Sequence, residues 1–139
     1  MLVKIILSMF IVLLFFGCGA RTGAGVKEYN LIKDFDSPMN YQKATNTIYD
    51  MSKYCASGLY KYNREDFEHV NKSVVYNELD HMGVKSYYMS IEIEANDNNT
   101  SHIKVYHYYN RDVERNMANL IKQWVTNNST ECLQGVNLF

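Results

Sequence analysis

The sequence is poor in the residues and motifs that usually indicate a function. It contains one proline and three cysteines among 139 residues. It has no glycine-rich phosphate loop, no Gly-x-Ser-x-Gly nucleophile motif and no His-Glu-x-x-His metal motif. Acidic and basic side chains nearly balance, and no basic stretch of the kind that binds nucleic acid is present. The sequence therefore gives no support to a nucleic-acid-binding role, and it predicts no metal and no cofactor.

What the chain does have is an apolar segment near its start. Lys4 supplies a positive charge, and Ile5 to Phe16 form an apolar run interrupted only by Ser8. The small residues and cysteine of Gly17-Cys18-Gly19-Ala20 follow at once. Because the run is shorter than the about 20 apolar residues of a membrane-spanning helix, it is typical of an export signal.

The end of this segment, Leu14-Phe15-Phe16-Gly17-Cys18, resembles the lipobox of bacterial lipoproteins. The resemblance implies that a signal peptidase cuts before Cys18 and that Cys18 carries the lipid. One position departs from the family pattern, because Phe15 stands three residues before the cysteine, where leucine is usual. Gly19 stands where aspartate would indicate inner-membrane retention, so resemblance to Gram-negative lipoproteins favours the outer membrane, facing the periplasm. The implied partner is a membrane, reached through the lipid on Cys18.

Two other interpretations of the same segment remain open. Cys18-Gly19-Ala20 also fits an ordinary secretory cleavage site, which would release a soluble periplasmic protein after Ala20. Alternatively, the segment stays attached as an N-terminal anchor. The lipobox interpretation divides the chain into a signal peptide at residues 1–17, a tether at residues 18–36 and one domain at residues 37–139.

If Cys18 is lipidated, Cys55 and Cys132 remain as a pair. In an exported chain such a pair most simply forms a disulfide. The pair lacks the Cys-x-x-Cys spacing of zinc sites and redox motifs. For a loop of this length the chain-entropy model gives about 4–5 kcal/mol of stabilisation, as an upper value.

Two apolar stripes predict two helices. Ser37-Pro38 combines a helix N-cap with a residue favoured at the first helical position, which predicts a helix over residues 38–57. Its stripe recurs at steps of three and four residues: Tyr41, Ala44, Ile48, Met51 and Cys55. A second stripe predicts a C-terminal helix between Asn110 and Asn127: Val113, Met117, Leu120, Ile121 and Trp124.

The clearest strand pattern is the alternation of apolar and polar residues over residues 84–95. A turn at residues 96–99 leads into a return strand over residues 102–109. Centring this hairpin on Asn98 pairs Ile93 with Ile103 and Glu92 with Lys104, so apolar groups meet on one face and opposite charges on the other. A further strand is predicted at residues 73–77, preceded by a polar loop at residues 59–72.

These elements predict an α+β fold: an N-terminal helix, a three-stranded antiparallel meander and a C-terminal helix, with both helices on one face of the sheet. Val105-Tyr106 in a strand, Trp124 in a helix and Cys132 near the end also resemble small bacterial envelope lipoproteins that join the first helix to the C-terminus by a disulfide. That resemblance spans residues 38–132 and implies no assigned activity.

The strand alternation places three tyrosines, Tyr88, Tyr106 and Tyr108, on the outer sheet face. Tyrosine is well suited to protein interfaces, which favours a surface that binds another envelope protein. Tyrosine also has a high β-strand propensity, so the alternative is that these tyrosines have a purely structural role. His102 and His107 fall on opposite faces, which gives no metal pair. We expect a non-catalytic binding or structural protein, with a small envelope enzyme as the remaining alternative.

Overall fold

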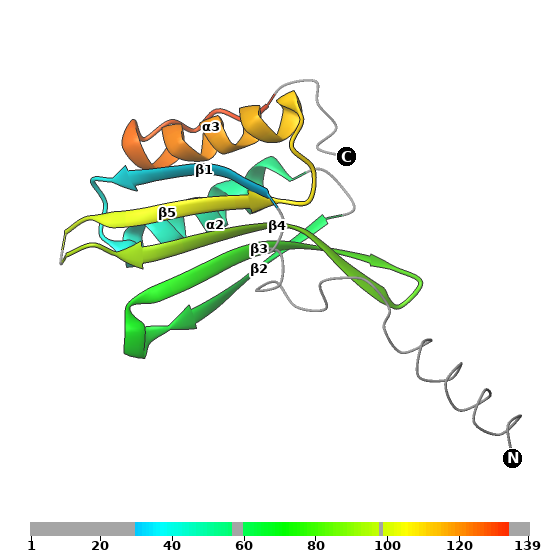
Figure 1. Ribbon diagram of the computed structural model, residues 1–139, viewed down its shortest axis with the longest axis horizontal. Coiled ribbons are helices and arrows are strands. Elements are labelled where there is room, and N and C mark those ends of the chain that lie inside the picture. The colour runs from blue at the N-terminus through cyan, green and yellow to red at the C-terminus, as the bar shows by residue number, and fades with distance from the viewer. Residues whose placement is uncertain (1–29, 57–59, 98, 134–139) are drawn as a thin grey trace, which may run out of the picture.

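The computed structural model describes residues 30–56, 60–97 and 99–133, which form a five-stranded antiparallel sheet and two helices (Figure 1). In chain order the elements are β1 (Asn30–Ser37), α2 (Tyr41–Cys55), β2 (Tyr60–Phe67), the 3₁₀ turn η2 (Glu68–Val70), β3 (Lys72–His81), β4 (Val84–Ala95), β5 (Ser101–His107) and α3 (Asp112–Thr126). The strand order across the sheet is β1-β5-β4-β3-β2. The predicted α+β class is confirmed, whereas the predicted number of strands, three, is wrong.

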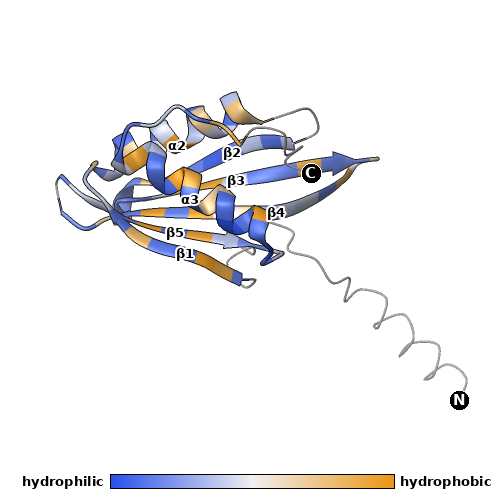
Figure 2. Cartoon of the chain, turned by 90° about the horizontal axis from the view of Figure 1, so that it is seen from above, coloured by the Kyte–Doolittle hydropathy of each residue, from blue (hydrophilic) through white to orange (hydrophobic). Residues whose placement is uncertain are grey.

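One apolar core lies between the sheet and the two helices, which lie over the same sheet face (Figure 2). Ile48 of α2, Trp124 of α3 and Ile91 of β4 are fully buried in it. The other sheet face carries charged side chains. On that face the Lys72 Nζ lies 3.1 Å from a Glu92 carboxylate oxygen and 2.8 Å from one of Glu94.

The strand β1 corrects the predicted tether, because residues 30–36 belong to the sheet. β1 pairs with β5 at the edge of the sheet. Phe35 points into the core, while Asp34 and Asp36 each lie 2.8 Å from a ring nitrogen of His102. An edge strand with charged residues on its solvent-exposed face leaves only a weak hydrophobic pattern, which explains the error.

The first helix begins later than predicted. Asn40 is the N-cap of α2, and its side-chain oxygen accepts a 2.9 Å hydrogen bond from the backbone N–H of Lys43. Ser37, the predicted cap, instead ends β1 and donates from its hydroxyl to the carbonyl of Val125 at 3.0 Å. Both residue types are good caps, so the local sequence alone does not choose between them.

The predicted polar loop at residues 59–72 is also wrong, since most of it is β2. Among the residues of β2 only Tyr62 is buried, so the strand carries almost no apolar alternation. Its order comes from pairing with β3 along its whole length. β3 is correspondingly longer than the predicted strand at residues 73–77.

The β4–β5 hairpin has the predicted register from Met89 to Ala95, including the Ile93–Ile103 and Glu92–Lys104 pairs. β4 continues past Met89 without β5, and β3 continues past Leu79 without β2. We call residues 80–87 the hairpin arm. Figure 1 shows that it projects past the other strands at one end of the sheet. Within the described residues, no helix is long and apolar enough to cross a membrane.

Candidate functional site: a tyrosine cluster at one end of the sheet

A bulge in β4 determines where the tyrosines point. Tyr76 pairs with Ser90, but Glu78 pairs with Tyr87, so Tyr88 and Met89 together face the single residue Asn77. Asn77 is fully buried, and its side-chain oxygen accepts the backbone N–H groups of Tyr88 at 3.1 Å and Met89 at 2.7 Å. The extra residue shifts the alternation of β4 by one position.

This shift corrects the predicted faces of two tyrosines. Tyr88, predicted on the outer face, lies on the helix side, with its ring 6.1 Å from the ring of Tyr60, which packs against the core. Tyr87, predicted on the inner face, contacts Tyr76 with ring centroids 5.5 Å apart. The predicted faces of the β4 side chains are therefore correct from Met89 to Ala95 and are exchanged at Tyr87 and Tyr88.

Tyr88 is the centre of four contacting rings, Tyr60, Tyr88, Tyr108 and Tyr109, which we call the tyrosine cluster. The Tyr88 ring meets Tyr108 edge to face at 6.2 Å and stacks on Tyr109 at 6.4 Å. Tyr108 and Tyr109 meet edge to face at 4.7 Å. Their side chains remain 46% and 42% exposed, so the cluster is a partly open aromatic surface.

Tyr106 does not join this cluster. It pairs with Ser90 in the regular part of the hairpin and alternates with the buried residues Val105 and His107, which places it on the opposite sheet face. Burial, together with the charge of Glu92, raises the pKa of Tyr106. Of the three predicted binding tyrosines, the structure thus brings Tyr88 and Tyr108 together and separates Tyr106 from them.

The border of the cluster is polar. The guanidinium carbon of Arg111 lies 4.5 Å from the ring centre of Tyr109, close enough for a cation–π contact. The same guanidinium is paired at 2.5 Å with Glu114, which is largely buried at the start of α3. Burial raises the pKa of Tyr60, with Tyr88 and Tyr109 contributing. The Tyr60 hydroxyl therefore stays protonated near neutral pH.

The buried His107 contacts the tyrosine cluster through Tyr109. The His107 ring lies 6.2 Å from the Tyr109 ring, and its Nδ1 accepts the backbone N–H of Tyr109 at 3.0 Å. Burial lowers the pKa of His107, which favours the neutral ring that this hydrogen bond requires. Among the described residues, no group of three His, Cys, Asp or Glu side chains is placed to hold a metal ion.

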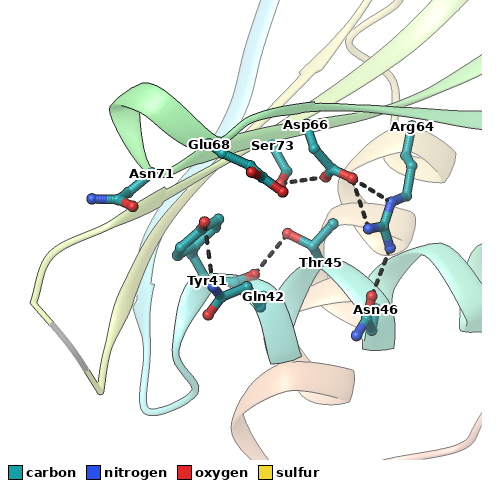
Figure 3. Close-up of a pocket in the computed structure, with 9 residues that line it drawn as sticks. All are labelled: Tyr41, Gln42, Thr45, Asn46, Arg64, Asp66, Glu68, Asn71 and Ser73. Carbon is teal, nitrogen blue, oxygen red and sulfur yellow. Dashed lines mark hydrogen bonds and ion pairs between the residues drawn. The ribbon is translucent and has the colours of Figure 1, made fainter.

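A second candidate is the polar pocket of about 460 Å³ between α2 and β2 (Figure 3). Its Arg64 guanidinium donates to Asp66 at 2.7 Å and to Asn46 at 2.6 Å. Asp66 also accepts the Ser73 hydroxyl at 2.8 Å. Burial opposes ionisation, but the hydrogen bonds from Ser73 and Arg64 lower the pKa of Asp66. Because these groups satisfy one another, the network links α2 to the sheet and offers little to a ligand.

The predicted disulfide is present, and Cys55 at the end of α2 is bonded to Cys132. Next to it, the indole N–H of Trp124 donates to the carbonyl of Glu131 at 2.8 Å. The two interactions hold the segment after α3 against the end of α2. Cys18 and residues 18–29 lie outside the described residues, so the lipid site and this part of the tether stay predictions.

No protein-family model, curated protein or solved structure matches this chain. The fold and the site define a small disulfide-bonded α+β domain with an aromatic surface at one end of its sheet.

Proposed function

We propose that this protein is a lipid-anchored cell-envelope protein with a non-catalytic binding role. In this proposal Cys18 carries the lipid, the outer membrane holds the protein on its periplasmic side, and the tyrosine cluster binds another envelope protein. The proposal combines the lipobox resemblance of residues 14–18 with the position of the cluster.

One observation carries the proposal: the chain from the proposed anchor enters the domain beside the cluster. Asn30 begins β1, and its side-chain amide donates to the backbone carbonyl of Tyr108 at 2.9 Å. Its backbone pairs with His107. A partner bound at the cluster would therefore be close to the segment that leads to Cys18.

The chemistry of the cluster fits a protein partner. Tyrosine combines a large apolar ring with a hydroxyl that forms hydrogen bonds, and it is enriched where proteins bind one another. Tyr108 and Tyr109 are exposed and lie outside the buried core, so packing of the core does not account for them. The disulfide also agrees with an oxidising compartment such as the periplasm.

The anchor is tested by labelling cells with palmitate. The wild-type chain should incorporate the label, whereas Cys18→Ser should not incorporate it and should accumulate as precursor. Cys55→Ser with Cys132→Ser is the control, because it removes two cysteines and keeps the lipobox. If Cys18→Ser is processed normally to a soluble form, the protein is secreted in the ordinary way and the anchor is wrong.

The binding surface is tested by crosslinking in cells, followed by mass spectrometry. Tyr109→Ser should remove the crosslinks to the partner, while Tyr106→Ser, an equal change on the opposite face, should keep them. Loss with Tyr106→Ser and retention with Tyr109→Ser would assign binding to the other face. Retention of all crosslinks in both variants would show that neither tyrosine surface binds the partner.

A further inference from the structure

The hairpin arm carries an apolar tip that the proposed binding surface leaves unexplained. Met82 is 92% exposed and Val84 is 66% exposed, and the two residues flank the turn at Gly83. Figure 2 shows hydrophobic residues at this end of the hairpin. Near the tip, Lys85 is paired with Glu78 at 3.0 Å, and the Asp80 carboxylate accepts the backbone N–H of Gly83 at 3.1 Å. Two exposed apolar side chains beside one turn, at the end of a projecting hairpin, form a small apolar surface that another apolar phase can cover.

The arm lies at the same end of the sheet as the start of the described chain. Asn30 pairs with His107, and His107 pairs with Met89, after which β4 continues into the arm paired with β3. From Asn77, which lies opposite Met89, to Met82 is five residues along β3, so the tip extends about 17 Å beyond the level of Asn30.

The length of chain before Asn30 matches this projection. Cys18 lies twelve residues before Asn30, so a lipid on Cys18 can be at most about 40 Å away. A random coil of the same length averages about 19 Å from end to end. The lipid and the arm tip can therefore reach the same plane, with the domain on one side of it.

We infer that the tip of the hairpin arm, Met82 and Val84, inserts into the interface of the bilayer that holds the lipid on Cys18. This inference rests on the anchor proposed above. Two apolar side chains bind a bilayer weakly, but a chain already held by its lipid meets the surface at a high effective concentration. The contact would hold the sheet upright and keep the tyrosine cluster a fixed distance above the headgroups.

The test places one tryptophan at the tip of the intact lipidated protein. Met82→Trp is compared with Asn99→Trp, which adds the same exposed ring at the opposite end of the sheet, in the β4–β5 turn. Both variants keep the buried Trp124, which gives a common background. Each is reconstituted into vesicles with and without brominated phospholipid, which quenches tryptophan on contact.

Met82→Trp should lose most of its added fluorescence in brominated vesicles, and Asn99→Trp should keep it. Equal quenching of both variants, or quenching of neither, would overturn the inference. Sedimentation with vesicles and palmitate incorporation report separately on the anchor, so failure of the lipid at Cys18 is distinguishable from failure of the arm contact. The unaltered lipidated protein supplies a second measurement. Amide hydrogen exchange at residues 84–87 should be slower in this protein in vesicles than in the Cys18→Ser protein. Equal exchange would overturn the inference as well.

Discussion

The Nδ1 atom of His107 accepts a 3.0 Å hydrogen bond from the backbone N–H of Tyr109. This bond exists only while Nδ1 is unprotonated. It ties the ionisation of a buried ring to the position of a residue on the aromatic surface. Glu114 and Arg111 act on the same ring with opposite effects, and burial decides the direction by lowering the pKa of His107.

The first prediction concerns pH. The folded pKa of His107 lies below its unfolded value of about 6.5, so between the two values the unfolded chain binds more protons. The contribution of His107 to stability should be complete above pH of about 6.5 and should be lost as pH falls from there through the folded pKa. Denaturant unfolding between neutral and mildly acidic pH measures this loss. His107→Asn keeps an acceptor near the Nδ1 position without a titrating ring, so its stability should fall less over this range; an identical fall would contradict the prediction.

The second prediction concerns the bulge. Asn77→Ala leaves the N–H groups of Tyr88 and Met89 without their side-chain acceptor, and each buried unsatisfied group costs about 1–3 kcal/mol. The free energy of unfolding in urea should fall by at least about 2 kcal/mol. Near-ultraviolet circular dichroism should also change, because Tyr88 loses its fixed place among the rings. Asn63→Ala on the neighbouring strand is the control and should stay within about 0.5 kcal/mol; equal effects of the two changes would show that Asn77 does not hold the bulge.

A third prediction compares tyrosines on the two sheet faces. Tyr88→Ser removes three ring contacts and should lower stability by about 1–3 kcal/mol. Tyr106→Ser, at a half-buried position of the other face, should cost less. Thermal unfolding of both variants gives the comparison. A larger loss for Tyr106→Ser would mean that the outer face contributes more packing than the cluster.

The fourth prediction concerns the disulfide. The mature protein, denatured without reductant, should show no free thiol at Cys55 or Cys132, and the double change to serine should lower stability by about 2–5 kcal/mol. The segment around Glu131 should then become more sensitive to proteases, because it loses its covalent link to α2 and keeps only non-covalent contacts such as the Trp124 hydrogen bond. Stoichiometric labelling of both cysteines in unreduced protein would contradict the bond.

The parts of the fold that the sequence predicted are those in which one element's own pattern is enough. Residues 89–95 alternate so regularly that both the strand and its register with β5 follow from them. The stripe ending in Trp124 likewise places α3 within a residue or two. In both cases the buried side chains are apolar and recur with the period of the strand or helix, so the sequence pattern alone indicates the element.

The parts that were missed depend on neighbours distant in sequence. β2 is a strand because β3 supplies its hydrogen bonds. Its own residues, such as Arg64 and Asp66, are typical of a solvated loop, so its local sequence does not predict a strand. The tyrosine cluster was missed because the position of Tyr88 depends on Asn77, eleven residues earlier, across the strand pair. Alternation alone cannot signal such a bulge; the one available signal was Asn77, which directly follows the apolar run Val74-Val75-Tyr76.

The pairing of β1 with β5 also fixes an order of events. A chain is made, and passes through any export channel, with its N-terminal end first. Yet among the strands of the described residues, β1 comes first in the chain and pairs with β5 (Ser101–His107), which comes last. Cys55 must wait still longer, for Cys132. The edge of the sheet can thus form only after residue 107 has been made, and the disulfide only after residue 132. A chain that ends before residue 101 would leave β1 without its pairing strand and prone to aggregate.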